Sequence, residues 1–338
     1  MTIFAVLTAA LFPLLHIGRL WKFYFLIPYP NQRGLWVNFK SPLLWDVFAV
    51  NTYMLISIIF FYVGLIPDIA VARDRATGIK KVVYTILALG WQGRGEQWKA
   101  HNRTVLHLSG LATPLVLSVH SVVSWDFAMS IVPGWHATIF APYFVAGAIF
   151  GGFAMVIVVM VPVRRIFGLE DYITNYHFEN MSRFILLTSL ICGYAYGAEY
   201  FIAWYSGSEF EQTSFWLRAF GPYWFSTWCM ITFNVIFPQL LWFKRLRTNI
   251  PFLFILCFLI NPGMWFERYV IIITSLSREY IPAAWGLYIP SPVELSVLAG
   301  SFCWFSMFFL LFLKIFPVIA ISEMKELAIH EKAHGGAH

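Results

Sequence analysis

Two ionisable residues stand at the facing ends of the first two apolar segments, and their types suit proton transfer. His16 lies near the end of the first segment, and Asp46 follows Ser41-Pro42 in the first turn of the second. Ionisable side chains inside a membrane are costly to keep there, so they indicate function by default. An imidazole accepts a proton near neutral pH, and a neighbouring carboxylate orients it. The pair therefore predicts a site that takes protons from a lipid-soluble substrate.

A quinol releases two protons and two electrons, so it needs proton acceptors at its hydroxyls, and His16 with Asp46 meets that need. Arg19, one turn beyond His16, could balance charge or hold Asp46. Trp45 and the other aromatic residues nearby suit a flat ring ligand, but they suit an interfacial aromatic belt equally well. A purely structural role also stays open, because both ionisable residues favour the dipole of their own helix.

Composition places these residues in a membrane. The chain is 59% hydrophobic and 12% charged, whereas a soluble protein has about 25% charged residues. The net charge of +6 comes from loops, so it reports topology and not nucleic-acid binding. Segment 79–91 is too short to span and predicts an interfacial helix. The predicted class is an all-α polytopic protein with about eight membrane helices, at approximately 1–17, 43–66, 104–129, 138–162, 184–205, 219–243, 250–276 and 292–320.

The basic residues set the orientation of these helices. Fifteen Lys and Arg residues lie in the loops after even-numbered helices and in the tail, against six in the other loops. The positive-inside rule then places the first two helices' facing ends at the outer side. Four of the six outer cations lie in one loop, namely Arg19, Lys22, Arg33 and Lys40. Either a partner or ligand on the outer side explains them, or long loops cross regardless of charge.

A second group of ionisable residues lies on segment 104–129, which carries His107, His120 and Asp126. The two histidines stand 13 residues apart, a spacing that suits haem b. That haem needs a second pair on another helix, and no other predicted helix has two histidines, so we do not expect haem. The three residues could instead line a proton path through the membrane.

Segment 250–276 adds Glu267 and Arg268 to this candidate proton path. Adjacent residues on a helix point about 100° apart, so we predict that these two do not pair with each other. Each then needs a partner on another helix, and a structural tie is as good an explanation as a proton relay. The four cysteines lie singly in apolar segments and predict buried free thiols, with no metal site in this chain.

Several motifs together resemble the membrane quinone-binding subunits of polysulfide reductase and NrfD proteins. Within that family they resemble the ten-helix core subunit of bacterial Alternative Complex III, a quinol oxidoreductase. The resemblance covers essentially the whole chain. The motifs are His16-Ile-Gly-Arg19, Ser41-Pro-Leu-Leu-Trp45-Asp46, His120-Ser-Val-Val-Ser-Trp-Asp126-Phe, Pro133-Gly-Trp-His136, Ala141-Pro-Tyr-Phe-Val-Ala-Gly147 and Asn261-Pro-Gly-Met-Trp-Phe-Glu267-Arg268.

The resemblance implies a function within a larger complex of the bacterial inner membrane. It implies oxidation of menaquinol or ubiquinol near the periplasmic face, at a site that holds His16, Arg19, Trp45 and Asp46. Electrons would pass to a periplasmic iron–sulfur subunit, with other membrane and haem c subunits as further partners. The chain itself would carry no metal or haem and would not act alone. The resemblance also implies a proton path through residues such as His120, Asp126 and Arg268.

The resemblance predicts two inverted four-helix bundles. We place the first, with the quinol site, at 1–129 and the second at 130–276, followed by a last membrane helix at 277–322 and a flexible cytoplasmic tail at 323–338. The family core has ten helices and we count eight, and the first is short. We therefore expect that two upstream helices are missing and that the first bundle is incomplete.

Two other functions remain open. The buried charges could belong to a transporter or channel for an ion or small solute, although they gather toward the outer half of the membrane and not at its midplane. The chain could also be a structural anchor for peripheral redox subunits. Loss of quinol oxidation on substitution of His16 or Asp46 would separate these readings.

Overall fold

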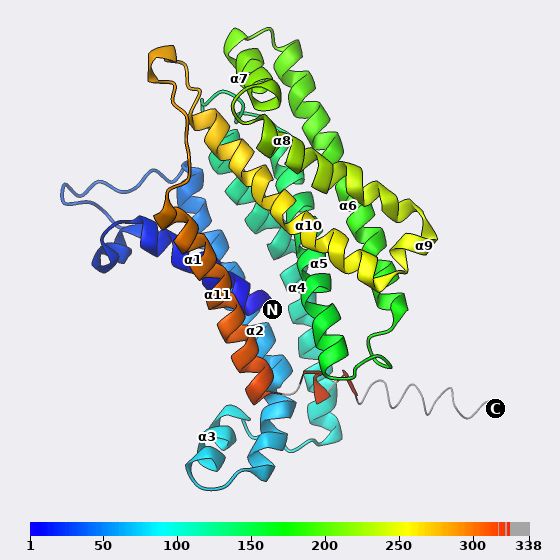
Figure 1. The fold of residues 1–338 in the computed structure, drawn as a ribbon. Coiled ribbons are helices and arrows are strands. Elements are labelled where there is room, and N and C mark those ends of the chain that lie inside the picture. The colour runs from blue at the N-terminus through cyan, green and yellow to red at the C-terminus, as the bar shows by residue number, and fades with distance from the viewer. Residues whose placement is uncertain (317, 322, 325–338) are drawn as a thin grey trace. The chain divides into compact units, whose positions relative to one another are not determined.

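All regular elements of the described chain are helices (Figure 1), as predicted. The computed structural model describes residues 1–316, 318–321 and 323–324, so the predicted tail lies almost wholly outside the described residues. The chain divides into two compact units. Unit 1 is Met1–Val119 with the segment from Pro290 onward, and unit 2 is His120–Ile289. The bundle boundaries drawn from the sequence stay a prediction.

The described helices confirm a polytopic membrane protein, with six or seven candidate spans where the sequence predicted about eight. A seventh span exists if α1 (Thr2–His16) and the short helix η1 (Leu20–Leu26), which are bent by 105°, count as one. The predicted span at 219–243 is helical but changes type twice, so no single piece is long enough. The six spans are α2 (Pro42–Arg75), α4 (Gly95–Ala128), α5 (Phe140–Ile166), α6 (Asn175–Tyr205), α10 with η4 (Ile250–Thr274) and α11 (Pro292–Ile315).

In unit 1, phenylalanine rings hold α1 against its neighbours. The ring of Phe4 on α1 lies 6.4 Å from that of Phe61 on α2 and 5.9 Å from that of Phe312 on α11. The rings of Phe61 and Phe312 are themselves 5.5 Å apart. Each such aromatic pair stabilises the packing by about 0.5–1.5 kcal/mol beyond the area it buries. This seam fixes the helix that carries His16 beside the helix that carries Asp46.

The two helices that begin at a Ser-Pro pair, α2 and α11, differ in their caps. Ser291 accepts a hydrogen bond from the Glu294 backbone N–H at 3.3 Å, and the Glu294 carboxylate accepts from the Ser291 N–H at 2.6 Å. This is a complete capping box at the start of α11. Ser41 precedes α2 with extended backbone but makes no side-chain cap bond. The proline after it presets the first turn, so that start depends on backbone geometry.

The predicted interfacial segment forms a helix, α3 (Ile79–Leu87). The Tyr62 hydroxyl donates to the Leu87 carbonyl at 2.6 Å, and the Arg73 guanidinium donates to the Trp91 carbonyl at 2.7 Å. These bonds hold the end of α3 and the turn after it against α2. The opposite face of α3 exposes an apolar stripe at helical spacing, made of Ile79, Val82, Val83 and Ile86.

We expect this apolar stripe of α3 to lie in the membrane interface. In a cysteine-free background, a spin label at Ile86→Cys should relax more with oxygen than with a water-soluble nickel chelate, because oxygen concentrates in lipid. A label at Lys81→Cys on the same helix should show the reverse. Equal aqueous accessibility at both positions would place α3 away from the bilayer.

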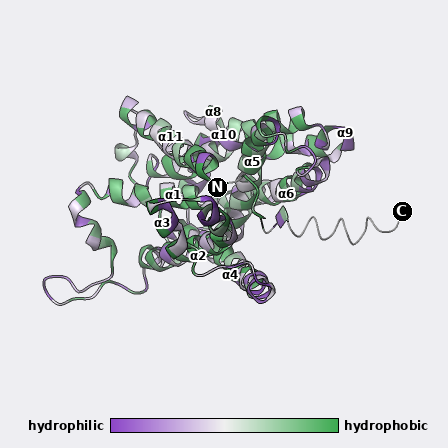
Figure 2. Ribbon diagram, turned by 90° about the horizontal axis from the view of Figure 1, so that it is seen from below, coloured by the Kyte–Doolittle hydropathy of each residue, from purple (hydrophilic) through white to green (hydrophobic). Residues whose placement is uncertain are grey.

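Unit 2 has its core between α5, α6 and α10. Phe150, Ile157, Ile185, Leu253 and Ile260 are fully buried there. Hydrophobic residues run along the helices, and hydrophilic residues gather at the short helix α9 (Lys244–Arg247) in Figure 2. The amphipathic helix α7 (Glu209–Phe220) contributes further buried polar residues to this unit.

Two of the four cysteines match the prediction of buried thiols, and one does not. All four are free, with Cys192 and Cys257 buried and Cys229 partly buried. Cys303 on α11 is exposed. The sequence prediction was wrong there because an apolar helix face in a membrane protein can face lipid as well as core.

Candidate functional site

His16 ends α1 just before a sharp bend in unit 1. Gly18 has φ +76°, a left-handed conformation that side chains with a Cβ rarely adopt. The chain turns there by 105° into η1. Arg19, the residue directly before η1, is exposed. The imidazole of His16 is itself exposed, and its ring lies 6.0 Å from the ring of Phe12 one turn earlier. The glycine therefore leaves the histidine at an open helix end.

Asp46 and Trp45 lie in the first turns of α2, and both are partly buried. The Trp45 indole donates to the Phe39 carbonyl at 2.8 Å, which fixes the loop before the helix. In unit 1, α1 packs on α2. That His16 and Asp46 act as a pair remains a prediction.

Unit 2 contains a polar cluster around Glu267, which is fully buried on α10. The Tyr196 hydroxyl on α6 donates a short hydrogen bond to the Glu267 carboxylate. The Asn234 side-chain amide donates to the same hydroxyl oxygen at 3.0 Å. Hydrogen bonds to a carboxylate are about twice as strong as neutral ones, and an unsatisfied buried group is costly. This chain of donors therefore ties three helical segments together around one acid.

The predicted absence of a Glu267–Arg268 pair is wrong. The Arg268 Nη2 lies 3.4 Å from the Glu267 Oε1, although the two residues are adjacent. The long arginine side chain folds back to reach its neighbour, which the directions of the Cα–Cβ bonds do not reveal. The second half of that prediction holds, because each residue also has a partner on another helix. Tyr196 binds Glu267, and the Arg268 guanidinium lies 3.9 Å from the ring centre of Phe144.

Two π-helical segments flank this cluster, η2 (Thr232–Ile236) and η4 (Val270–Thr274). Such widened turns are rare and often occur at functional sites. Asn234 lies inside η2, and its carbonyl accepts a hydrogen bond from the Ser189 hydroxyl at 2.6 Å. Gly263 on α10 makes room for it, because a Cβ there would stand 2.3 Å from the Asn234 Oδ1.

We expect Gly263→Ala to destabilise the protein by about 1–3 kcal/mol, the usual cost of overpacking. The added methyl would also meet the Phe233 Cβ at 2.7 Å, and the Asn234 side chain is held in place by its hydrogen bond to the Tyr196 hydroxyl. Thermal unfolding in detergent measures the effect. Gly197→Ala on α6 is the matched control, since nothing lies within 4 Å of its Cβ position. Equal melting temperatures for both variants would contradict the prediction.

A second buried charge group lies on α7, around Arg218. Its guanidinium donates to the hydroxyls of Thr274 at 2.7 Å and Ser275 at 2.5 Å and lies over the Phe215 ring. Burial lowers the pKa of Arg218 from its usual range, and the nearby carboxylate of Glu199 opposes that shift. Glu199 is buried on α6, and its Oε1 has no hydrogen-bond partner among the described residues.

Glu211 connects α7 to the loop before α5. Its Oε1 accepts from the Gly134 backbone N–H at 3.2 Å and lies 3.3 Å from the His136 Nε2. The histidine side chain is half exposed, whereas Glu211 is buried. Arg218 interacts electrostatically with both Glu199 and Glu211. A line of ionisable groups therefore runs from a buried acid to an exposed imidazole.

The other predicted path residues fall at different places on α4. His107 is exposed in unit 1, and its Nδ1 lies 2.6 Å from the Arg103 carbonyl one turn earlier. His120 and Asp126 belong to unit 2, where both are partly buried and His120 interacts electrostatically with Arg268. The Asp126 Oδ1 is buried without a hydrogen-bond partner among the described residues. His120 thus lies within electrostatic range of Arg268, whereas His107 has only a local partner.

Sequence reasoning named Glu267 but missed Tyr196 and Asn234, which hold it. A signal for one of them exists on α6. Tyr196, Glu199 and Tyr200 stand at spacings of three and four residues, so they share one helix face. Asn234 gives no such signal, since it is a single polar residue in an apolar run. Among the described residues, no group of three or more His, Cys, Asp or Glu side chains could hold a metal ion.

A family model described as "Polysulphide reductase, NrfD" matches residues 1–278 of the chain. The chain belongs to this family. Its members are membrane subunits of redox complexes that interact with quinone and with iron–sulfur catalytic subunits. The match includes α1, the first turns of α2 and the whole Glu267 cluster.

One curated relative supports the same family. The chain is 26% identical over 162 residues to a protein of Halobacterium salinarum (strain ATCC 700922 / JCM 11081 / NRC-1) whose name describes a membrane subunit of a dimethyl sulfoxide reductase. The alignment covers 47% of this chain and 33% of that protein. The chain therefore aligns with about a third of the relative's length.

Proposed function

We propose that this chain oxidises quinol in the membrane as one subunit of a redox complex. The observation that carries the proposal is the NrfD family match over residues 1–278, a range that includes the helices with His16 and Asp46. The resemblance to the core subunit of Alternative Complex III narrows the acceptor to a periplasmic iron–sulfur subunit. Haem c subunits would take the electrons further.

The proposed chemistry balances at two residues of unit 1. A quinol loses two protons and two electrons to become a quinone. His16 accepts one proton at its imidazole, and the Asp46 carboxylate accepts the other or orients the imidazole. An iron–sulfur cluster of a partner subunit would supply the acceptor for the two electrons, and the protons leave to the outer side. Arg19 balances the carboxylate charge, and Trp45 forms a flat wall beside the ring.

The second part of the proposal concerns the protons. His120, Asp126, Glu267 and Arg268 belong to a path that moves protons within unit 2, and His107 of unit 1 is a separate candidate for proton transfer. The buried Glu267 supports this role, because a carboxylate with a hydroxyl donor can hold or release a proton. We add Tyr196 to this path as the donor that positions the Glu267 carboxylate.

Electron transfer by the assembled complex tests the proposed function. Membranes that hold the complete complex should reduce its acceptor with a quinol analogue, and membranes from a strain that lacks this chain should not. A complementing copy of the gene should restore the rate. Full quinol oxidation without this chain would leave it the role of an anchor.

A second candidate, transport of an ion or small solute, has one observation in its favour. Glu267, Glu199 and Arg218 are buried ionisable groups, and such groups line ion paths in transporters. Vesicles that contain this chain alone decide between the two. Solute-dependent flux without a redox partner would favour transport, and its absence with active quinol oxidation in the complex would exclude it.

A further inference from the structure

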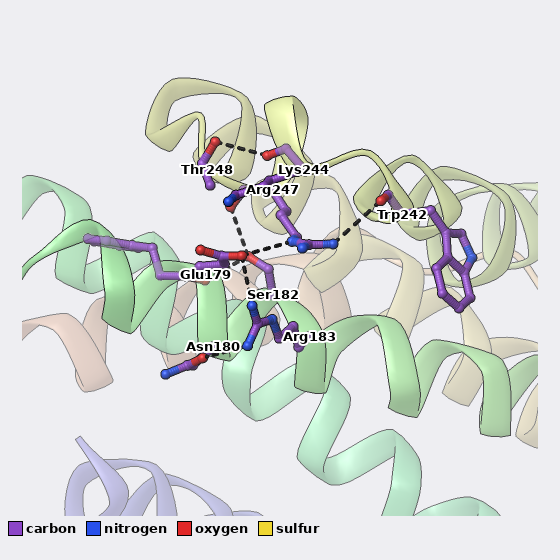
Figure 3. Close-up of polar contacts among 9 residues, drawn as sticks. Glu179, Asn180, Ser182, Arg183, Trp242, Lys244, Arg247 and Thr248 are labelled. Atoms are coloured by element: carbon purple, nitrogen blue, oxygen red, sulfur yellow. Dashed lines mark hydrogen bonds and ion pairs between the residues drawn. The ribbon is translucent and has the colours of Figure 1, made fainter.

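The inner end of unit 2, as predicted from the basic loops, contains a group of cations that share one acid (Figure 3). The Glu179 Oε1 on α6 accepts from the Arg183 Nη2 at 2.9 Å and from the Arg247 Nε at 3.2 Å. The Arg247 carbonyl also accepts from the Ser182 hydroxyl at 3.4 Å. These contacts fix α9 against α6. One carboxylate pairs with two guanidinium groups, so this group of residues has a net positive charge.

Two further cations on α9 have no acidic ion-pair partner among the described residues. The side chains of Lys244 and Arg245 are exposed and form no hydrogen bond or ion pair with other described residues. No Asp or Glu occurs between residues 212 and 266. The surface around α9 therefore carries three more positive charges than negative ones, counting Arg183, Lys244, Arg245 and Arg247 against Glu179.

Large exposed rings come directly before these cations. Trp242 is 60% exposed and Phe243 is 65% exposed. The Trp242 indole donates to the Gln239 side chain at 3.1 Å, and the Trp242 carbonyl lies 3.4 Å from the Arg247 Nη1. An amphipathic ring beside a cation is typical of the membrane interface, where rings lie at the acyl boundary and cations at the phosphates.

We propose that the α9 surface, defined by Trp242, Phe243, Lys244 and Arg245, binds the headgroup of an anionic phospholipid. Lys244 and Arg245 contact the phosphate, and the two rings pack on the glycerol and upper acyl chains. Arg247 and Arg183 add positive electrostatic potential to this surface, and their ion pairs with Glu179 hold them in place. Juxtamembrane basic clusters attract anionic lipid in this way.

The aromatic residues decide between a lipid and a soluble acidic partner. The segment before α9 is apolar and helical, so Trp242 and Phe243 continue a hydrophobic surface up to the cations. An anionic phospholipid matches this order, because its apolar acyl chains lie next to its charged headgroup. A soluble acidic protein would match the cations but would leave this apolar surface facing its polar partner.

Titration of the purified, delipidated complex with phosphatidylglycerol tests the proposal by native mass spectrometry. The double variant Lys244→Gln/Arg245→Gln should lower the affinity of the tightest phosphatidylglycerol site by about 30-fold, because each interfacial cation contributes about 1 kcal/mol to the binding of anionic lipid. The matched control is Lys80→Gln/Lys81→Gln on α3, which removes the same charge from another basic segment. It should keep that tightest site, and phosphatidylcholine should not occupy it in any variant.

Three results would overturn the proposal. The first is an unchanged affinity of the tightest phosphatidylglycerol site in the α9 variant. The second is an equal loss of affinity in the α3 control, which would indicate non-specific attraction by positive charge and not a defined site. The third is loss of a protein subunit from the α9 variant with its lipid retained, which would assign the surface to a protein. If the variant does not assemble, photoactivatable phosphatidylglycerol on the unaltered complex should label the peptide that contains residues 242–249. Labelling elsewhere would contradict the site.

Discussion

Asp46→Asn should lower quinol oxidation by the assembled complex by about 10²- to 10⁴-fold, the range for loss of a general base. The amide keeps the shape of the side chain in the first turn of α2 but cannot accept a proton. His16→Ala should give a loss of similar size, because it removes the other proton acceptor. Steady-state oxidation of a quinol analogue by purified complex measures both effects.

Asp74→Asn is the control for this prediction. It makes the same chemical change at the other end of α2, where Asp74 is exposed and pairs with Arg73 at 2.9 Å. Exposed ion pairs contribute little to stability, so we expect normal turnover. Unchanged turnover in both Asp46→Asn and His16→Ala, with the complex intact, would remove the quinol site from unit 1.

The parts of this fold that were predictable from the sequence depend on sums over many residues. A run of about 20 apolar residues has to cross the membrane as a helix, since lipid cannot satisfy its backbone groups. That argument predicted α5 and α11 to within about five residues at each end, whereas α2 extends nine residues beyond its predicted end. It failed at 219–243, where the apolar run is present but π and 3₁₀ turns interrupt the α-helix.

The reason for that failure is tertiary. Asn234 turns its amide to the Tyr196 hydroxyl, and its carbonyl takes a bond from Ser189. Both partners lie on α6, some 40 residues away in the chain. A local pattern carries no information on such bonds, and the widened turn exists only together with them.

The candidate sites also differ in how far the local sequence could predict them. His16 and Asp46 were selected because each is an ionisable residue in an apolar segment and one loop joins their helices, and their role stays a prediction. The Glu267 cluster was half found. Its acid is visible in the sequence, but Arg268 reaches it by folding back and Tyr196 reaches it across the bundle. Side-chain reach and helix packing decide both contacts, and neither follows from positions on one helix.

Glu267→Gln should separate proton movement from electron transfer. The amide can still accept from Tyr196, so the helices stay tied, but it cannot hold a proton. We expect the protons moved per quinol in proteoliposomes, beyond the two that each quinol itself releases, to fall to near zero, while quinol oxidation at the unit 1 site continues within a few-fold of the normal rate. Proton transfer through a path that has lost its acid should slow by about 10²-fold or more.

Two further variants assign the effect to the carboxylate. Glu170→Gln makes the same change at an exposed loop position and should keep full stoichiometry. Tyr196→Phe removes the hydroxyl donor but keeps the acid, so it should lower the proton yield less than Glu267→Gln does. Full stoichiometry in Glu267→Gln would exclude the path through this acid. Equal loss of oxidation and proton movement, with an unchanged melting temperature, would contradict the expected separation, because quinol oxidation would then also depend on this acid.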